Sequence, residues 1–264
     1  MAKDSASVLR RQVDEQGICR VTLNREKALN SLNGDLVEAM GEAFYEMRYD
    51  DEVRVVIVTG AGERAFCAGA DLVERRQMDE GAVRRRIDDY RDVFRRIAGI
   101  PKPTICAING YAFGGGLELA MACDLRVVDE DTEIGLTELK LGIIPGAGGT
   151  QRLSRLVGVA RAKELIFTGA RISGRRAAEI GLVNYAVPSE SVMDKAEELA
   201  QQMVTSAPIA VAQAKRAIDT GSGVDLESGL ELESAAYAIT LPTEDREEGL
   251  AAFKEKRTPK FEGK

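Results

Sequence analysis

Apolar residues recur along the chain with two periods, which together predict alternating strands and helices. Three short apolar runs rich in β-branched residues predict strands at residues 18–23, 53–59 and 104–109. Two longer segments carry apolar residues three or four positions apart, as on one face of a helix: Leu36, Met40, Ala43, Phe44 and Met47 in the first, and Val83, Ile87, Tyr90, Phe94 and Ile97 in the second. The order of these elements predicts an α/β fold.

The pattern changes near residue 188. Residues 182–187 predict the last clear strand, which Pro188 closes. The rest of the chain predicts four amphipathic helices, at residues 191–205, 209–220, 226–240 and 244–256, with Pro and Gly residues between them. We therefore divide the chain into a β-rich core, residues 1–188, and a helical region, residues 189–264, whose apolar faces predict packing on another subunit.

The composition excludes several classes of function. None of the 264 residues is a histidine, which removes Ser-His-Asp and Cys-His catalysis and most zinc sites. The four cysteines form no Cys-x-x-Cys pair, so we expect buried thiols and no metal site. A net charge of −7, with 5% aromatic residues and no Trp, argues against nucleic-acid binding.

The lengths of the apolar segments bear on where the protein is located. No run of about 18 apolar residues occurs, and residues 1–8 contain no apolar signal core. We therefore expect a cytoplasmic protein that does not bind membranes.

The helix over residues 83–97 carries many Arg interspersed with acids, which predicts a solvated, ion-paired face rather than a nucleic-acid surface.

Two glutamates border an almost uncharged segment in the middle of the chain. Glu118 follows Gly114-Gly115-Gly116, where a predicted strand and turn give way to a predicted helix over 117–123, and Glu138 comes twenty residues later. Free N–H groups at a helix start, approached closely through glycine, suit a developing oxyanion, and two carboxylates suit acid/base work. Taken alone, the glycines are better explained by close packing, Glu118 by a favourable interaction with the helix dipole, and Glu138 as a solvated surface acid.

Three further segments rich in small residues have competing interpretations. Gly60-x-Gly62-x-x-Ala65 matches a dinucleotide fingerprint, but Gly69 falls where the fingerprint's helix should run, so nicotinamide binding is the disfavoured interpretation. Residues 146–150 resemble a phosphate loop without its Gly-Lys-Ser/Thr end. Residues 65–71 predict a loop that either presents backbone N–H groups to a ligand or simply turns into the next helix.

Taken together, these segments resemble the enoyl-CoA hydratase/isomerase (crotonase) family over nearly the whole chain. Four motifs carry the resemblance in order: residues 24–30, 65–72, 109–120 and 142–153. The resemblance implies a spiral of repeated ββα units followed by a helical region that forms trimers, two of which commonly stack as a hexamer. On this basis residues 1–188 are the catalytic core and residues 189–264 the oligomerisation region.

The resemblance also implies roles for individual residues. The N–H groups of Ala70 and Gly115 would form the oxyanion hole for the thioester carbonyl of an acyl-CoA, and Glu118 and Glu138 would be the catalytic carboxylates. Further contacts with substrate or coenzyme A are implied at Lys27, Ala28, Ala68, Asp71, Leu72 and Gly114, and at Phe253 and Lys256 of a neighbouring subunit. Coenzyme A is part of the substrate, so no separate cofactor is expected.

The presence of both acids favours hydration of a 2-enoyl-CoA, with Glu118 activating water and Glu138 protonating C2. Isomerases of the family often keep only one acid, so isomerisation, or another enolate-based reaction, is the alternative. Val73 departs from the family pattern, because many hydratases have a Lys there that approaches the coenzyme A phosphates. Arg75, Arg76 and Lys27 are candidates to replace it.

Within the family, the resemblance is greatest to the methylglutaconyl-CoA hydratases of leucine breakdown, through residues 162–167, 224–226 and 242–256. Those proteins use a lysine-rich first helix for RNA, whereas residues 35–51 here are mainly acidic, so we expect no RNA binding. An RNA-binding scaffold and a nicotinamide-dependent oxidoreductase are the less favoured classes. The sequence leaves open whether the substrate belongs to fatty-acid β-oxidation or carries a second carboxylate, as in leucine degradation.

Overall fold

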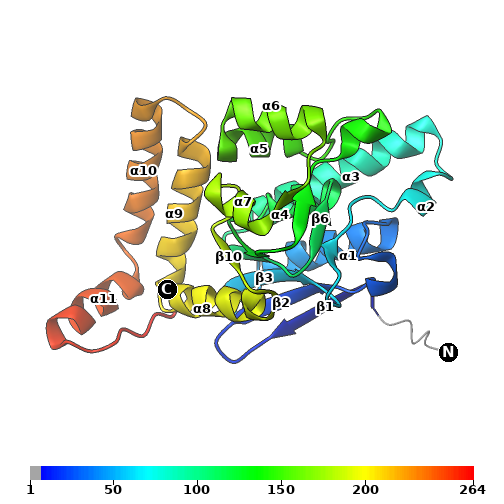
Figure 1. The fold of residues 1–264 in the computed structure, drawn as a ribbon. Coiled ribbons are helices and arrows are strands. Elements are labelled where there is room, and N and C mark those ends of the chain that lie inside the picture. Colours follow the sequence, from blue (N-terminus) through cyan, green and yellow to red (C-terminus); the bar gives the residue numbers. More distant parts are fainter. Residues whose placement is uncertain (1–6) are drawn as a thin grey trace.

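A computed structural model describes residues 7–264. The sequence predicted no signal core in residues 1–8, and the first six of these residues lie outside the described range. Its centre is a six-stranded sheet in the order β1-β2-β3-β5-β7-β10, parallel except for the β1–β2 pair (Figure 1). The strands are β1 (Leu9–Val13), β2 (Ile18–Leu23), β3 (Val55–Gly60), β5 (Thr104–Ile108), β7 (Leu125–Asp129) and β10 (Tyr185–Val187). A predominantly parallel sheet requires cover on both faces, which the helices provide.

A second, four-stranded sheet has the order β4-β6-β8-β9. Its strands are β4 (Ala65–Cys67), β6 (Tyr111–Phe113), β8 (Glu133–Gly135) and β9 (Ile172–Ser173). Along the chain from β3 to β8, successive strands alternate between the two sheets, and helices follow each pair. The fold is therefore the spiral of ββα units that the sequence resemblance predicted.

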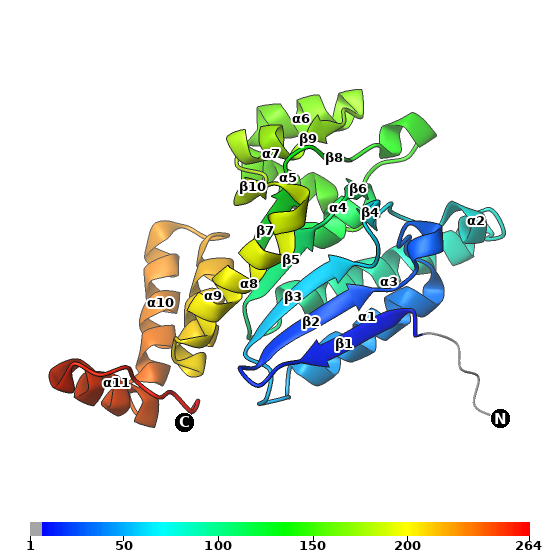
Figure 2. The same cartoon turned by 60° about the horizontal axis from the view of Figure 1, so that its bottom comes forward.

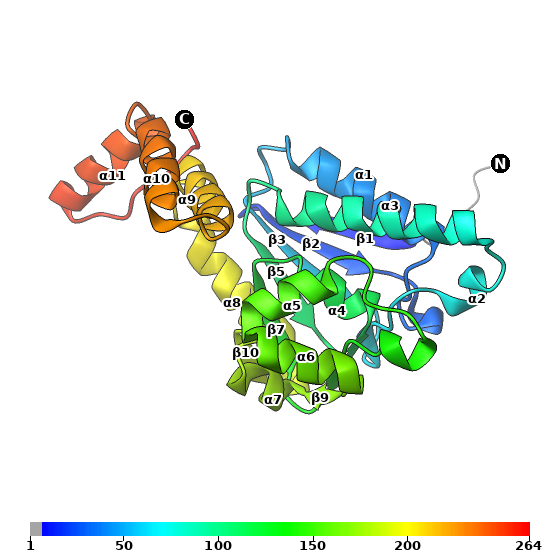
Figure 3. The same cartoon turned by 90° about the horizontal axis from the view of Figure 1, so that it is seen from above.

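The helices of the first 188 residues cover the sheets or connect them. They are α1 (Gly34–Met47), α2 (Leu72–Arg75), α3 (Glu80–Ala98), α4 (Gly115–Ala120), α5 (Gly149–Val157), α6 (Val159–Thr168) and α7 (Gly174–Glu179). Two short 3₁₀ turns, η1 (Glu26–Ala28) and η2 (Glu138–Leu141), lie in the connections, and a third, η3 (Ser189–Ser191), follows β10. Figure 3 shows α1 and α3 lying side by side along one face of the large sheet.

The sequence of β3 explains why both faces of this sheet are covered. All six residues of the strand are buried. Val56 and Val58 join the core beneath α1 and α3, whereas Val55 and Ile57 join a separate core on the opposite face. Side chains alternate across a strand, so a continuous apolar run serves two cores at once.

The opposite core is closed by α8 (Val192–Val204), which lies across the sheet (Figure 2). Val192, Ala196 and Ala200 of α8 are buried there against β3, β5 and β7. The first helix of the predicted 189–264 region therefore packs on the sheet of its own chain. The boundary near residue 188 marks a change of composition, while the packing continues through α8.

The last three helices, α9 (Pro208–Gly221), α10 (Leu226–Thr240) and α11 (Glu244–Glu255), stand to one side of the sheets (Figures 1 and 2). They expose large apolar side chains, among them Ile218, Leu226, Tyr237, Leu250 and Phe253. Exposed apolar patches of this kind are typical of surfaces that bind another molecule. Among residues 7–264, no helix has the length and apolarity needed to cross a bilayer.

Several predicted boundaries were wrong. The 65–71 loop contains strand β4, and the helix predicted at 117–123 begins at Gly115 and ends at Ala120. The strand predicted at 182–187 is confined to Tyr185–Val187, and the edge strand β1 was not predicted. Gly60 and Gly62 lead into β4 rather than into the helix that follows a dinucleotide-binding turn.

Candidate active site

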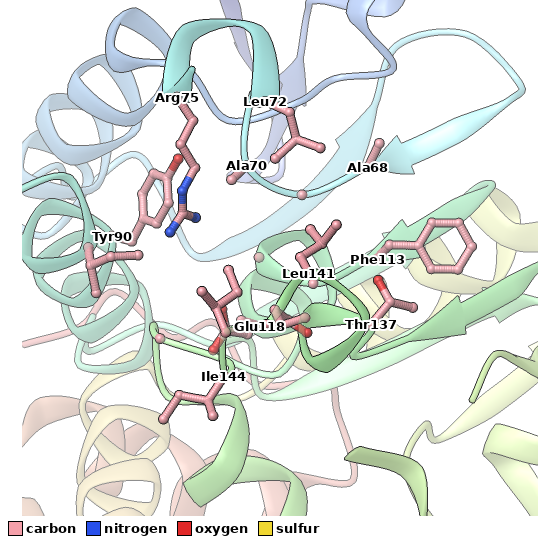
Figure 4. A pocket seen from close by; sticks show the side chains of 18 of the residues that line it. Ala68, Ala70, Leu72, Arg75, Tyr90, Phe113, Glu118, Thr137, Leu141 and Ile144 are labelled. Atoms are coloured by element: carbon pink, nitrogen blue, oxygen red, sulfur yellow. The ribbon is translucent and has the colours of Figure 1, made fainter. Parts of the chain in front are cut away.

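A pocket of about 580 Å³ opens between the loop after β4, the start of α4, the 3₁₀ turn η2 and the middle of α3 (Figure 4). Seven of the twelve residues that the sequence predicted for the site line it: Ala68, Ala70, Leu72, Gly114, Gly115, Glu118 and Glu138. The fold therefore brings together motifs that are up to seventy residues apart in the sequence.

Glu118 lies in the first turn of α4 and is only 3% exposed. Its Oε1 accepts hydrogen bonds from the backbone N–H groups of Ala147, at 2.8 Å, and Gly149, at 2.7 Å. Burial raises the pKa of the carboxyl, and these two donors and the charges of Arg152 and Arg91 partly oppose that rise. The segment that resembles a phosphate loop thus binds a carboxylate of its own chain.

Glu138 lies at the start of η2, and its surroundings differ from those of Glu118. Both of its carboxyl oxygens are buried, and neither accepts a hydrogen bond of good geometry from any residue in the described range 7–264. Burial raises the pKa of Glu138 to about 7; its own backbone N–H opposes the rise and the negative charge of Glu118 adds to it. Because burial and the charge of Glu118 disfavour the anion more than this one N–H stabilises it, a large fraction of the carboxyl is protonated near neutral pH.

The backbone N–H groups of Ala70 and Gly115 lie on the wall of the same pocket. Leu32 pairs with the segment around Ala70 as in a parallel sheet: its N–H donates to the carbonyl of Gly69, and its carbonyl accepts from the N–H of Asp71. The N–H of Ala70, between these two residues, therefore points away from Leu32. Gly115 is the first residue of α4, where N–H groups have no partner within the helix. A Cβ built on Gly115 would lie 3.7 Å from the nitrogen of Ala70, which shows how close the two segments are.

Glycine at position 116 makes this approach possible. A Cβ there would lie 2.1 Å from the carbonyl oxygen of Cys67 in β4, and real side chains never come so close. Any larger residue would separate α4 from β4 and move Gly115 away from Ala70. The three glycines between strand and helix, for which the sequence offered both a packing and a functional explanation, therefore satisfy both.

Asp71 supports the site instead of lining the pocket. Its carboxylate accepts hydrogen bonds from the N–H groups of Val73 and Glu74, which caps α2, and it forms an ion pair with Arg25 at 2.9 Å. The pair and the N–H donors lower the pKa of Asp71 against the opposing effect of burial. Asp71 thereby fixes the loop that carries Ala70.

The remaining predicted contacts lie outside this pocket in the single chain. Lys27 lines a separate pocket of about 320 Å³, and Ala28 is its neighbour in η1. Phe253, which is 86% exposed, and Lys256 lie at the end of α11, on the opposite side of the chain from α2 (Figure 1), and neither lines the pocket. Since these two residues were assigned to a neighbouring subunit, their role stays a prediction. Val73 is 72% exposed and does not line the pocket.

Sequence reasoning missed part of the pocket wall. Ile87 and Tyr90 were assigned only to the apolar face of a helix, yet both line the pocket from α3. Leu141, Ile143 and Ile144 form an apolar wall after Glu138, and Arg75 and Arg91 add positive charge. The apolar residues that directly follow Glu138, at positions 139, 141, 143 and 144, were the sequence signal that could have indicated this wall.

Comparison with known proteins gives the same class as the fold and the pocket. The family model for enoyl-CoA hydratase/isomerase matches residues 13–264. This chain belongs to the enoyl-CoA hydratase/isomerase family, whose members act on acyl-CoA substrates.

Three proteins illustrate the relationship. The human mitochondrial enoyl-CoA hydratase domain-containing protein 2 is 49% identical over 95% of this chain and 87% of its own length. Human mitochondrial methylglutaconyl-CoA hydratase is 43% identical over 99% of this chain and 78% of its own. A crystal structure of an enoyl-CoA hydratase from Bacillus anthracis superposes with a TM-score of 0.96 at 49% identity, covering 97% of this chain and all of that one.

Proposed function

We propose that this protein is a hydro-lyase that adds water across the 2,3 double bond of a short-chain 2-enoyl-CoA. The observation that carries the proposal is the placement of two buried carboxyl groups, those of Glu118 and Glu138, beside the backbone N–H groups of Ala70 and Gly115 in one pocket. Hydration needs these two pairs of groups, because it moves two protons and develops negative charge on one oxygen.

The N–H groups of Ala70 and Gly115 bind the thioester oxygen. Addition of water at C3 places negative charge on this oxygen as an enolate forms. Two fixed backbone donors stabilise that charge, and the loss of one such donor typically costs about 2.7–4 kcal/mol. The ion pair and helix cap made by Asp71 hold Ala70 in position, so Asp71 acts through Ala70.

The environments of the two acids support a division of roles. Glu118 accepts two N–H hydrogen bonds, which favour its carboxylate form, and it takes a proton from the attacking water. Within residues 7–264, Glu138 accepts no hydrogen bond of good geometry, and its pKa is raised to about 7, so it is available as the acid that protonates C2. The hydroxyl goes to C3 and the proton to C2, after which the acids exchange protons through the next water.

In this proposal the coenzyme A moiety leaves the pocket on the side that carries Lys27, Ala28 and Ala68. The N–H of Ala68 donates to the carbonyl of Leu29, so the wall of the pocket continues into the segment that carries Lys27 and Ala28. Phe253 and Lys256 of a neighbouring subunit complete the coenzyme A site in a trimer or a hexamer. The apolar side chains exposed on α9, α10 and α11 support this assembly.

The proposal is tested by following the ultraviolet absorbance of the conjugated thioester in crotonyl-CoA. Wild-type protein should remove it, and Glu118→Gln should lower kcat by about 10²- to 10⁴-fold while leaving the circular dichroism spectrum unchanged. Glu164→Gln, an exposed substitution on α6, is the matched control and should keep full activity. Near-normal turnover by Glu118→Gln would refute the assignment. Conversion of a 3-enoyl-CoA without hydration of crotonyl-CoA would instead identify an isomerase.

A further inference from the structure

Arg75 is the last residue of α2, and its guanidinium points into the active-site pocket beside Tyr90 (Figure 4). The side chain is half-buried and, within residues 7–264, it forms no hydrogen bond or ion pair. Its neighbour Glu74 is already paired with Arg86 at 3.0 Å and bonded to the N–H of Gly34. A guanidinium that loses water without gaining a partner is costly, so this group is available for an anionic ligand.

Arg91, the other arginine of the pocket wall, is not available in the same way. Its Nε donates to the carbonyl of Gly146 at 2.7 Å, and its Nη1 lies 3.1 Å from Asp88. Those bonds hold Arg91 against the 146–149 loop that positions Glu118. Of these two guanidinium groups, Arg75 is the one with all its donors free.

The position of Arg75 indicates which part of a substrate it meets. Figure 4 shows Arg75 and Tyr90 on one side of Ala70 and Glu118, with Ala68 and Phe113 on the other. In the proposed function the thioester carbonyl lies at Ala70, and coenzyme A leaves past Ala68. The acyl chain then runs toward Arg75.

We infer that Arg75 binds a second carboxylate at the far end of the acyl chain, and that the substrate class is a 2-enoyl-CoA whose chain ends in a carboxylate. This inference rests on the proposed function for the direction of the chain. The planar fork of a guanidinium matches a carboxylate and binds it through two parallel hydrogen bonds. Arg75 also offsets the repulsion that Glu118 and Glu138 would exert on a dicarboxylic chain.

The test compares two five-carbon substrates that differ only at the end of the chain, glutaconyl-CoA and 2-pentenoyl-CoA. Wild-type protein should show the higher kcat/KM with glutaconyl-CoA. Arg75→Met, which keeps the length of the stem, should lower kcat/KM for glutaconyl-CoA by about 10- to 100-fold and change that for 2-pentenoyl-CoA less than about threefold. Arg75→Lys should retain part of the preference. Arg161→Met, an exposed substitution on α6 outside the pocket, is the matched control and should behave as wild type.

Two results would overturn the inference. A wild-type preference for 2-pentenoyl-CoA would remove the need for a carboxylate receptor. An equal loss with both substrates in Arg75→Met would place Arg75 on the coenzyme A moiety. Binding of the unreactive glutaryl-CoA and pentanoyl-CoA, measured by calorimetry, separates this inference from the proposed reaction. If neither enoyl-CoA is hydrated, tighter binding of glutaryl-CoA that Arg75→Met abolishes would still support the receptor.

Discussion

The N–H of Gly149, the first residue of α5, donates a 2.7 Å hydrogen bond to Oε1 of Glu118, and the two residues lie in direct contact. A Cβ on residue 149 would lie 2.9 Å from this oxygen and 2.8 Å from Cβ of Pro145. Gly149→Ala should therefore displace the Glu118 carboxylate and lower kcat by about 10-fold or more, with a smaller change in KM. Steady-state kinetics with crotonyl-CoA measure both constants.

Gly81→Ala is the control for this substitution. Its added Cβ would meet its nearest neighbours at 3.4 Å, an ordinary contact at the start of α3, and kcat should not change. A Gly149→Ala enzyme with wild-type kcat would show that the position of the Glu118 carboxylate tolerates the added methyl group.

Glu138 should reduce the stability of the folded protein at alkaline pH. Because its pKa is raised to about 7 from a normal value of 4.5, the folded state holds its proton more tightly than the unfolded state does. The free energy of unfolding should fall as pH rises from about 4.5 to about 7 and then level off. Glu138→Gln should therefore be more stable than wild type at pH 8, by on the order of 2 kcal/mol, and nearly equal to it at pH 4.5. Urea unfolding at the two pH values measures the difference in free energy of unfolding between the variant and wild type. A difference that does not depend on pH would contradict the raised pKa of Glu138.

The same carboxyl should control the pH dependence of hydration. If protonated Glu138 is the acid, kcat/KM should fall about tenfold per pH unit above a pKa near 7. At acidic pH, kcat/KM should decrease as Glu118 becomes protonated, because this base must be ionised. Burial raises the pKa of Glu118, so the decrease should begin at a higher pH than for an ordinary glutamate. The residual activity of Glu138→Gln should lack the alkaline limb. An alkaline limb that survives in this variant would assign the acid to another group.

The exposed apolar surface of α9 and α10 should mediate assembly. Ile218 and Tyr237 are exposed in the single chain, so Ile218→Asp with Tyr237→Asp should leave the fold intact and reduce a trimer or hexamer to smaller species. Tyr49→Asp, an equally exposed aromatic position after α1, should have no effect on assembly. Sedimentation velocity distinguishes the species. These substitutions are preferable to truncation after Pro188, which would remove α8 from the core of the chain itself.

The C-terminal helices were predicted closely from sequence because their signals are local. Predicted helices at 226–240 and 244–256 correspond to α10 and α11 within one residue, since Asp225 and Thr243 cap them and Pro242 separates them. The short strand β4 was missed because three residues carry no periodic pattern, and its partners in the second sheet come from distant segments. Bounds that depend on long-range pairing cannot be derived from local preferences.

The sequence by itself determined the order of strands and helices, the absence of histidine chemistry, and the motifs that carry Glu118, Glu138, Ala70 and Gly115. These features depend on residue type and on neighbours along the chain. Only the tertiary structure decided what surrounds each group. Glu118 has two N–H donors, whereas in the described part of the chain Glu138 has no donor of good geometry and the guanidinium of Arg75 in the pocket has no partner. The reason is physical, because burial and hydrogen bonding set the charge of a group, and both are made by segments that meet only when the chain has folded.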